Sequence, residues 1–372
     1  MCTSAQTGDD AVLTSAAELS DSCAWCLETE TTMRLRDKGC RVLAAVLVAL
    51  FILGGRPSAR GPEYGSFITF GDSLADIGNV FILSQVLGID PPPPPSSAYF
   101  QGRFSNGPVG FEYLWQLLSG KAPGSPGSMR AFLSSPLNGA EGAVDYAFGG
   151  TGTPRRDVTP GGLAAPGLEG QIELYRLSLR GRKPSPRTLF AIVTGANDYR
   201  LDAFHQPLTP PESVGNIRNA VATLYEMGAR DVMVLNLPDL GLIPANVADP
   251  TAATQLSLLH NALLKNALDS LAAQLPRLNL IQVDLFQLPS RLPPGMNFVV
   301  PALDFLFPPG PPLPPGFFMS TCLFVDPATC ATVPTFNVPG TFVFWDVVHP
   351  TTFVHGVLGE YLHERLVESL VD

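Results

Sequence analysis

The chain is poor in charged residues, and its basic residues are not clustered. Of its 372 residues only 15% are charged, well below the roughly 25% of an average soluble protein. Acidic residues outnumber basic ones by 33 to 23, which gives a net charge of −10. Because binding to phosphate groups depends on clustered lysine and arginine, we expect no nucleic-acid partner and favour a neutral or apolar one.

Several catalytic and cofactor-binding motifs are also absent. The chain has no H-E-x-x-H zinc motif, no Walker loop and no G-x-G-x-x-G after a predicted strand. Cys23 and Cys26 have the spacing of half a zinc site, but no second pair accompanies them. The G-x-S-x-G elbow of ordinary α/β-hydrolases is missing too, since Leu74 and Ala75 follow Ser73. We therefore expect neither a cofactor nor a metal.

Cysteines are rare in the part of the chain that we expect to fold. Four of the six lie in the first forty residues, and only Cys322 and Cys330 lie further on. In an exported protein a pair at this spacing closes a short loop through a disulfide, which is the pairing we expect. Two free buried thiols are the alternative.

One long apolar run stands near the amino terminus. The basic stretch from Arg34 to Arg41 precedes the run Val42–Leu53, an order typical of a secretory signal. The run is too short for a stable membrane span, which needs about 20 apolar residues. We therefore expect a secreted or periplasmic monomer whose signal begins near Met33. The expected segments are an acidic extension, explained by a start assigned too far upstream (1–32), a signal peptide with a short linker (33–61) and a folded domain (62–372).

Strand and helix patterns alternate through the folded domain. Nearly continuous apolar runs predict buried strands, and apolar residues at helical spacing predict helices. The expected strands are 67–70, 188–194, 231–237, 278–283 and 341–344; the expected helices are 76–87, 108–118, 168–179, 213–227, 252–275 and 351–370. This alternation predicts an α/β fold, a doubly wound parallel sheet with helices on both faces.

Polar side chains follow three of the predicted strands: Ser73, Asn197, and the pair Asp346 and His349. The carboxyl ends of parallel strands meet at one edge of a sheet, so these residues can share a crevice. A serine nucleophile needs a base, and the base needs an orienting group. His349 lies in a predicted turn, three residues after a carboxylate. The alternative is that Asp346 caps the next helix while His349 packs beside it.

Five sequence blocks stand in order along the folded domain: Phe70–Asn79 (F-G-D-S-L-A-D-I-G-N), Gly102–Gly107, Tyr146–Gly150, Gly195–Asp198 (G-A-N-D) and Asp346–Pro350 (D-V-V-H-P). In this order they resemble the blocks of the GDSL (SGNH) hydrolase family of lipolytic enzymes, and the segment Asn236–Gly241 is also similar to one that recurs in the family. The resemblance covers about residues 66 to 370 and implies a flavodoxin-like three-layer fold with esterase or lipase activity.

The resemblance assigns a role to each residue of a catalytic triad. It implies that Ser73 is the nucleophile, His349 the general base and acid, and Asp346 its orienting partner. Two other acidic residues in the blocks, Asp72 and Asp198, are expected to brace their loops through hydrogen bonds to backbone amides.

The resemblance also implies an oxyanion hole. Its donors would be the backbone N–H groups of Ser73 and Gly150 and the side-chain amide of Asn197. A tetrahedral intermediate places negative charge on one oxygen, and losing one such donor costs about 10² to 10³ in rate. Gly107 is the glycine that competes with Gly150 for this role.

The substrate class stays open at this point. We expect an ester, whether a lipid, a short-chain acyl ester or an acetylated sugar. The apolar stretch Pro301–Phe318 suits a rim for acyl chains, although such a loop can equally be core cover. The alternatives are an acyltransferase or a phospholipase with the same triad and, more remotely, a binding protein that uses this fold without turnover.

Overall fold

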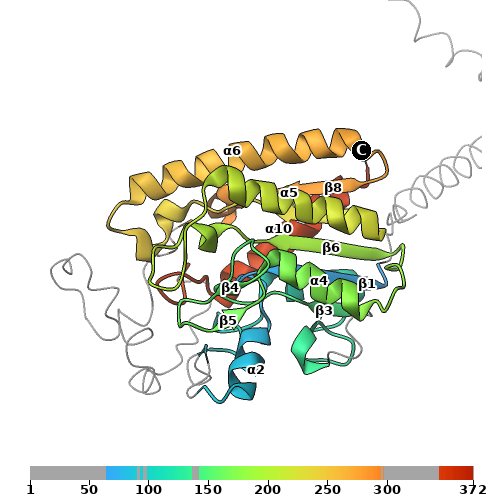
Figure 1. Cartoon of the computed structure of the whole chain (residues 1–372), viewed down its shortest axis with the longest axis horizontal. Coiled ribbons are helices and arrows are strands. Elements are labelled where there is room, and N and C mark those ends of the chain that lie inside the picture. The colour runs from blue at the N-terminus through green and yellow to red at the C-terminus, as the bar shows by residue number, and fades with distance from the viewer. Residues whose placement is uncertain are drawn as a thin grey trace, which may run out of the picture. The chain divides into compact units, whose positions relative to one another are not determined.

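The centre of the protein is a parallel β-sheet of six strands (Figure 1). The structure is a computed structural model that describes residues 64–89, 93–94, 99–135, 142–294, 296 and 343–371. These belong to the second of two units, residues 1–60 and 61–372. Every neighbouring pair of strands runs parallel. In sheet order the strands are β2 (Arg130–Ala131), β3 (Ala143–Asp145), β1 (Ser66–Gly71), β6 (Thr188–Val193), β7 (Asp231–Leu235) and β8 (Asn279–Val283).

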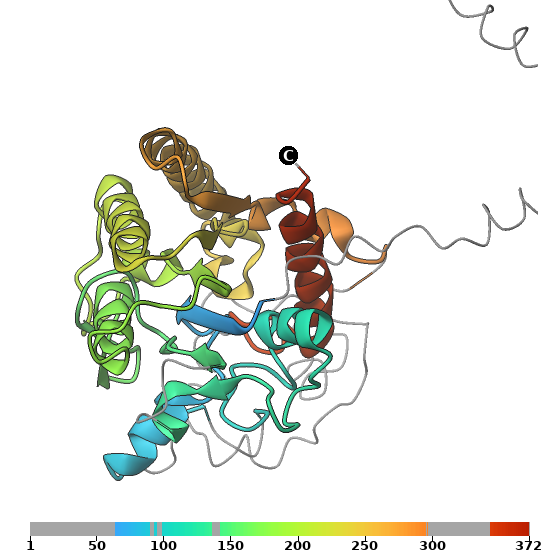
Figure 2. The ribbon, with the colours of Figure 1, turned by 90° about the vertical axis from the view of Figure 1, so that its right-hand side faces the viewer.

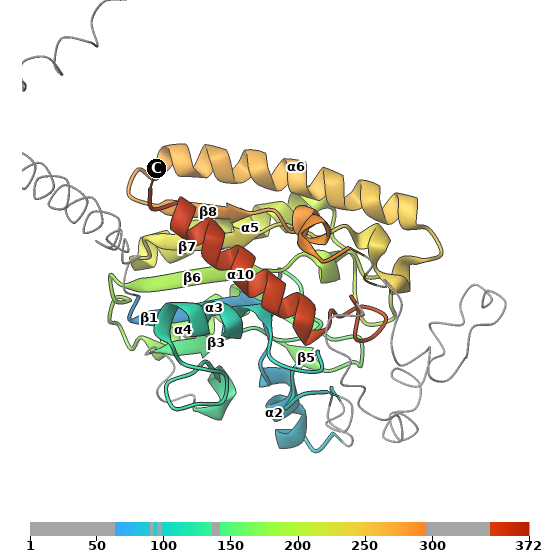
Figure 3. The same ribbon diagram turned by 180° about the vertical axis from the view of Figure 1, so that it is seen from behind.

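Helices cover both faces of the sheet, which confirms the predicted doubly wound α/β fold (Figure 2). Alternate strand residues face opposite layers, so Phe67 and Leu189 pack in one core while Ile68 and Phe190 pack in the other. One layer holds α3 (Gly110–Ser119) and α10 (Thr352–Glu368), and α10 crosses the strands in Figure 3. The other layer holds α4 (Leu168–Ser178), α5 (Pro210–Met227) and α6 (Pro250–Gln274).

Sequence signals at the helix ends explain where α5 begins and ends. Thr209 and Glu212 form a capping box, with Pro210 in the first turn, which satisfies amide groups that a helix start leaves without partners. The helix ends at Gly228, whose φ of 117° few other residues adopt. The predicted helices at 108–118, 168–179, 252–275 and 351–370 match observed helices to within a few residues.

The helix predicted at 76–87 starts later than expected. It is observed as α2 (Asn79–Val86), because the Asp76 carboxylate accepts hydrogen bonds from the backbone N–H groups of Gly78, Asn79 and Val80. Asp76 therefore caps this helix from outside it.

The strand predicted at 341–344 is wrong for the part that the structure describes. Phe344 makes one isolated antiparallel bridge to Pro350 and does not join the sheet. The chain turns back at once, since the Trp345 N–H donates to the His349 carbonyl at 2.7 Å. Several segments of the sequence analysis lie outside the described residues: the signal segment at 33–61, the stretch 301–318, the pair Cys322 and Cys330, and residues 341 and 342.

The strand order places a crevice beside β1. After β1 the chain forms β2 and β3 on one side of that strand, and it then crosses to form β6 on the other side. The loops that follow the carboxyl ends of β1 and β6 therefore run in opposite directions, which opens a crevice between them. Within the described ranges, no helix is both long and apolar enough to cross a membrane.

Candidate active site

Ser73 lies just past the end of β1, where the strand meets β6. Gly71, the last residue of the strand, has a φ of 148°, and a Cβ there would lie 1.9 Å from the Val193 carbonyl oxygen. A side chain at position 71 would therefore force the two strands apart. The Asp72 N–H donates to the same carbonyl at 3.2 Å, which leaves Ser73 buried at 8% exposure beside the crevice.

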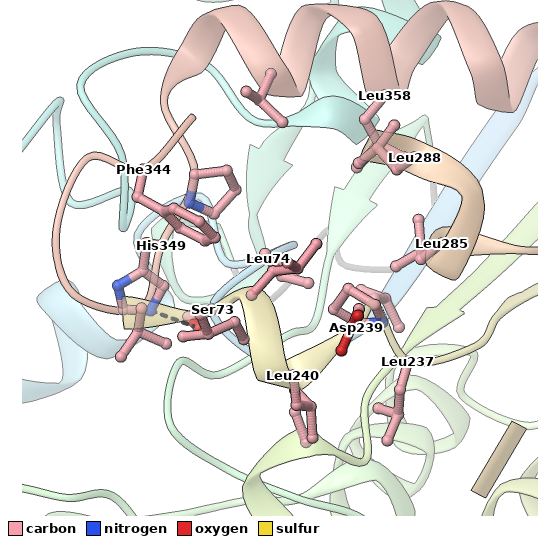
Figure 4. Close-up of a pocket in the computed structure, with 18 of the residues that line it drawn as sticks. Ser73, Leu74, Leu237, Asp239, Leu240, Leu285, Leu288, Phe344, His349 and Leu358 are labelled. Atoms are coloured by element: carbon pink, nitrogen blue, oxygen red, sulfur yellow. Dashed lines mark hydrogen bonds between the residues drawn. The ribbon is translucent and has the colours of Figure 1, made fainter. Parts of the chain in front are cut away.

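The structure brings Ser73, His349 and Asp346 into one chain of hydrogen bonds, of which Figure 4 shows the one between Ser73 and His349. His349 Nε2 lies 2.8 Å from Ser73 Oγ, and His349 Nδ1 lies 2.6 Å from Asp346 Oδ2. Burial disfavours ionisation of Asp346, but the nearby His349 and hydrogen bonds from His349 and Tyr99 outweigh it and hold its pKa below the ordinary value. An ionised Asp346 only accepts hydrogen bonds, so His349 Nδ1 carries the proton and Nε2 is free to accept the serine proton.

The loop after β6 carries Asn197 on a short helix, η4 (Ala196–Tyr199). Its Nδ2 donates to the Thr151 carbonyl at 3.1 Å, and the residue lines the same cavity as Ser73. Gly150 has a φ of 77°, and Arg200 Nη1 donates to its carbonyl at 2.6 Å. No hydrogen bond from the Ser73 or Gly150 backbone N–H is seen among the described residues. These groups are therefore free to bind a ligand oxygen.

The competing glycine has a different environment. A Cβ at Gly107 would lie 2.5 Å from Thr352 Oγ1 at the start of α10. The Thr352 hydroxyl donates to the Pro108 carbonyl at 2.9 Å. Gly107 thus lets the chain pass close to α10, which is a packing role.

Asp198 braces its loop through hydrogen bonds, as expected. Its carboxylate accepts from the N–H and hydroxyl of Thr153, both at 2.8 Å, and from the Ser213 hydroxyl at 2.5 Å. Burial raises its pKa above the ordinary value. These contacts connect the Asn197 loop to α5 and to the loop that carries Gly150.

An apolar cavity of about 130 Å³ opens beside Ser73 (Figure 4). It runs along the carboxyl ends of β6, β7 and β8 toward α10, and most of its lining is aliphatic. Sequence reasoning did not identify this lining, because its residues come from several separate segments. Leu240, Leu285 and Leu288 lie in the short helices η5 (Leu240–Leu242) and η7 (Leu285–Arg291), Leu237 and Phe344 lie in connecting segments, and Leu358 lies in α10.

A parallel α/β sheet that carries a hydrogen-bonded serine, histidine and aspartate at its crevice is typical of serine hydrolases. The chain belongs to the GDSL-like Lipase/Acylhydrolase family, whose model matches residues 67–362. The protein is accordingly a hydrolase that acts on esters.

Individual relatives are distant. The chain is 26% identical to a phosphatidylcholine-sterol acyltransferase of Aeromonas hydrophila, over 84% of this chain and 93% of that protein. It is 28% identical to esterase EstA of Pseudomonas aeruginosa, over 87% of this chain but only 50% of that longer protein. Among solved structures, an acetylxylan esterase of Geobacillus stearothermophilus shows 13% identity and a TM-score of 0.40, over 82% of this chain and 96% of that one.

Proposed function

We propose that the protein is a secreted carboxylic ester hydrolase that uses Ser73, His349 and Asp346 in an acyl-enzyme mechanism. The observation that carries the proposal is the continuous hydrogen-bond chain from Ser73 Oγ through the imidazole to the buried Asp346 carboxylate. The basic-then-apolar order at 34–53 supports export.

The first half of the reaction transfers the acyl group to the enzyme. Ser73 Oγ attacks the ester carbonyl carbon while its proton passes to His349 Nε2. The oxyanion that forms accepts hydrogen bonds from the Ser73 and Gly150 N–H groups and from Asn197 Nδ2. The bond to the alcohol oxygen then breaks, and that oxygen takes the proton from His349. A neutral alcohol departs, and the acyl group remains bound to Ser73 as an ester.

The second half releases the acid. A water molecule gives a proton to His349 Nε2 as its oxygen attacks the acyl carbon, and the same donors hold the second oxyanion. The bond from the acyl carbon to Ser73 Oγ breaks, and Oγ recovers the proton from the imidazole. The enzyme is restored and the carboxylic acid departs.

The apolar cavity beside Ser73 supports an ester with an apolar acyl group as the substrate. Its lining is mostly aliphatic, which suits the burial of hydrocarbon. Charged acyl groups would not be solvated by its aliphatic lining.

Acyl transfer is the second candidate, since one relative is a phosphatidylcholine-sterol acyltransferase. An alcohol would then replace water in the second half of the reaction. Adding a sterol or a simple alcohol and measuring ester product against free acid separates the two reactions.

The test compares the full chain with Ser73→Ala in a secreting host. Activity on p-nitrophenyl acetate, butyrate and palmitate is measured in medium and cell fractions, with Ser125→Ala at an exposed turn as the control. We expect activity in the medium that is abolished by Ser73→Ala and unchanged by Ser125→Ala, and the profile across the three esters reports the acyl length that the cavity accepts. The proposal would be contradicted if Ser73→Ala turned over the esters as fast as the wild type. It would also be contradicted if no serine-directed phosphonate labelled the folded wild-type protein.

A further inference from the structure

We propose that Tyr99 is a positioning residue for the catalytic base, acting through Asp346. Its hydroxyl donates to Asp346 Oδ2 at 2.6 Å, and His349 Nδ1 lies 2.6 Å from the same oxygen. The inference rests on the proposed function, because it concerns how the base of that triad is oriented. No family block contains Tyr99, and 247 residues separate it from Asp346 in the sequence.

Tyr99 completes the hydrogen bonding of a carboxylate that water does not reach. Asp346 is 0% exposed, and its other oxygen accepts from the N–H groups of Val348 and His349 at 2.7 and 2.6 Å. Those donors all belong to the turn that contains Asp346 itself. Among the described residues, Tyr99 is the one donor from outside that turn, so it ties the turn to the rest of the protein.

The tyrosine is itself held in place. Its side chain is 6% exposed, and its ring packs edge-on against Trp345 with the ring centres 6.4 Å apart. The segment that follows runs beside the His349 turn, since the Ser105 hydroxyl donates to the Pro350 carbonyl at 2.9 Å. The Phe104 ring also lies 5.0 Å from the imidazole. The contact between Tyr99 and Asp346 is therefore part of a packed interface.

The hydroxyl has a definite electrostatic effect on the base. The Tyr99 hydroxyl shares the negative charge of Asp346 Oδ2 with His349, so it weakens the attraction of that carboxylate for a charged imidazolium. Removing it favours the protonated imidazolium, which cannot accept the Ser73 proton, and it loosens the turn that aims the ring. The first effect moves the acidic limb of the pH profile upward, and the second lowers kcat.

The main test is Tyr99→Phe in the full chain, which keeps the ring and removes the donor. We expect kcat on p-nitrophenyl butyrate to fall about tenfold, the loss typical of one hydrogen bond to a charged group. KM should be unchanged, because Tyr99 is not among the described residues that line the cavity, and the acidic limb of kcat/KM should move to higher pH.

The matched control is Tyr361→Phe. This tyrosine is also 6% exposed, and its hydroxyl donates to the backbone carbonyl of Asp284. It should leave kcat and the pH profile unchanged. In an Asp346→Asn background, Tyr99→Phe should cause little further loss, because the residue through which it acts has already been altered.

A second substitution covers the case in which Tyr99→Phe does not fold. Fluorotyrosine at position 99 keeps the hydroxyl and makes it a stronger donor, so the acidic limb should move to lower pH. An acidic limb that moves in neither variant overturns the role of Tyr99. If Ser73→Ala is inactive in the same assays, that outcome leaves the proposed function standing; an active Ser73→Ala overturns both.

Discussion

Asp72 is a carboxyl group buried directly beside the proposed nucleophile. It is 3% exposed, and its Oδ1 accepts the Leu74 N–H at 3.0 Å. Burial raises its pKa from the ordinary value to about 7, only partly opposed by that hydrogen bond and by His349. In the unfolded chain the same group has a pKa near 3.9. Between these values the native protein holds a proton that the unfolded chain releases.

Asp72→Asn should therefore stabilise the protein in a pH-dependent way. A carboxyl group with a raised native pKa contributes stability below about pH 4, and that stability is lost as the pH rises through 7. Asparagine keeps the acceptor for Leu74 and never ionises. We expect the variant to exceed the wild type in free energy of unfolding by up to about 4 kcal/mol at pH 8, and by little at pH 4.

Urea unfolding at the two pH values measures this difference. Comparing variant with wild type cancels the titration of other buried groups, such as Asp76, whose pKa burial raises to about 6. A gain of equal size at both pH values would show that Asp72 is ionised throughout.

At the scale of elements, α10 begins shortly after His349 and packs closely against α3. A Cβ at Gly359 in α10 would lie 2.5 Å from Tyr113 Cβ and 3.0 Å from the Gly110 carbonyl oxygen. Neither atom is the mobile end of a side chain. Glycine at 359 therefore sets the separation of the two helices.

Gly359→Ala should push α10 away from α3 and disturb the turn that precedes it. We expect a loss of about 1–3 kcal/mol in the free energy of unfolding, the usual cost of overpacking, together with lower kcat. Gly356→Ala lies on the same helix but meets no described atom within 4 Å. That control should gain about 0.5–1 kcal/mol from better helix propensity. Thermal unfolding and kcat of both variants test this, and equal stability for the two would refute it.

Long elements were predictable from the sequence, while short ones were not. The six buried residues of β6 form an apolar run that helical spacing does not explain, and the 25 residues of α6 give a clear pattern. By contrast, β2 has two residues and β3 has three, which is too short for any periodicity. β3 exists because β1 offers it an edge to pair with, and β2 because β3 does, a cause that lies outside their own sequence.

The candidate site divides in the same way. Ser73 and Asn197 follow predicted strands, and Asp346 and His349 share one turn, so position and spacing made them candidates. The resemblance to the GDSL family was needed to assign their roles. Tyr99 carries no such mark, because its contact is made across the fold by a segment without regular structure. The cavity leucines were missed for a related reason, since apolar residues in connecting segments resemble ordinary core.

At the scale of the whole molecule, the contacts described at the site join residues that lie far apart in the sequence. Ser73 and His349 are 276 positions apart, and they meet because β1 lies in the centre of the sheet while α10 closes one face. All the site residues named above belong to the second unit of the chain, residues 61–372.

A chain that begins at residue 62 should keep both stability and activity. We expect its Tm and its kcat/KM on p-nitrophenyl butyrate to match those of the full chain, because the sequence predicts a signal peptide and a short linker over residues 33–61, ahead of the folded domain. Removing residues 343–372 instead takes away Asp346, His349 and α10, and exposes the core that α10 covers. That truncation should give no folded, active enzyme. Loss of activity on removing only residues 1–61, in protein with an unchanged Tm, would show that the earlier unit contributes to the reaction itself.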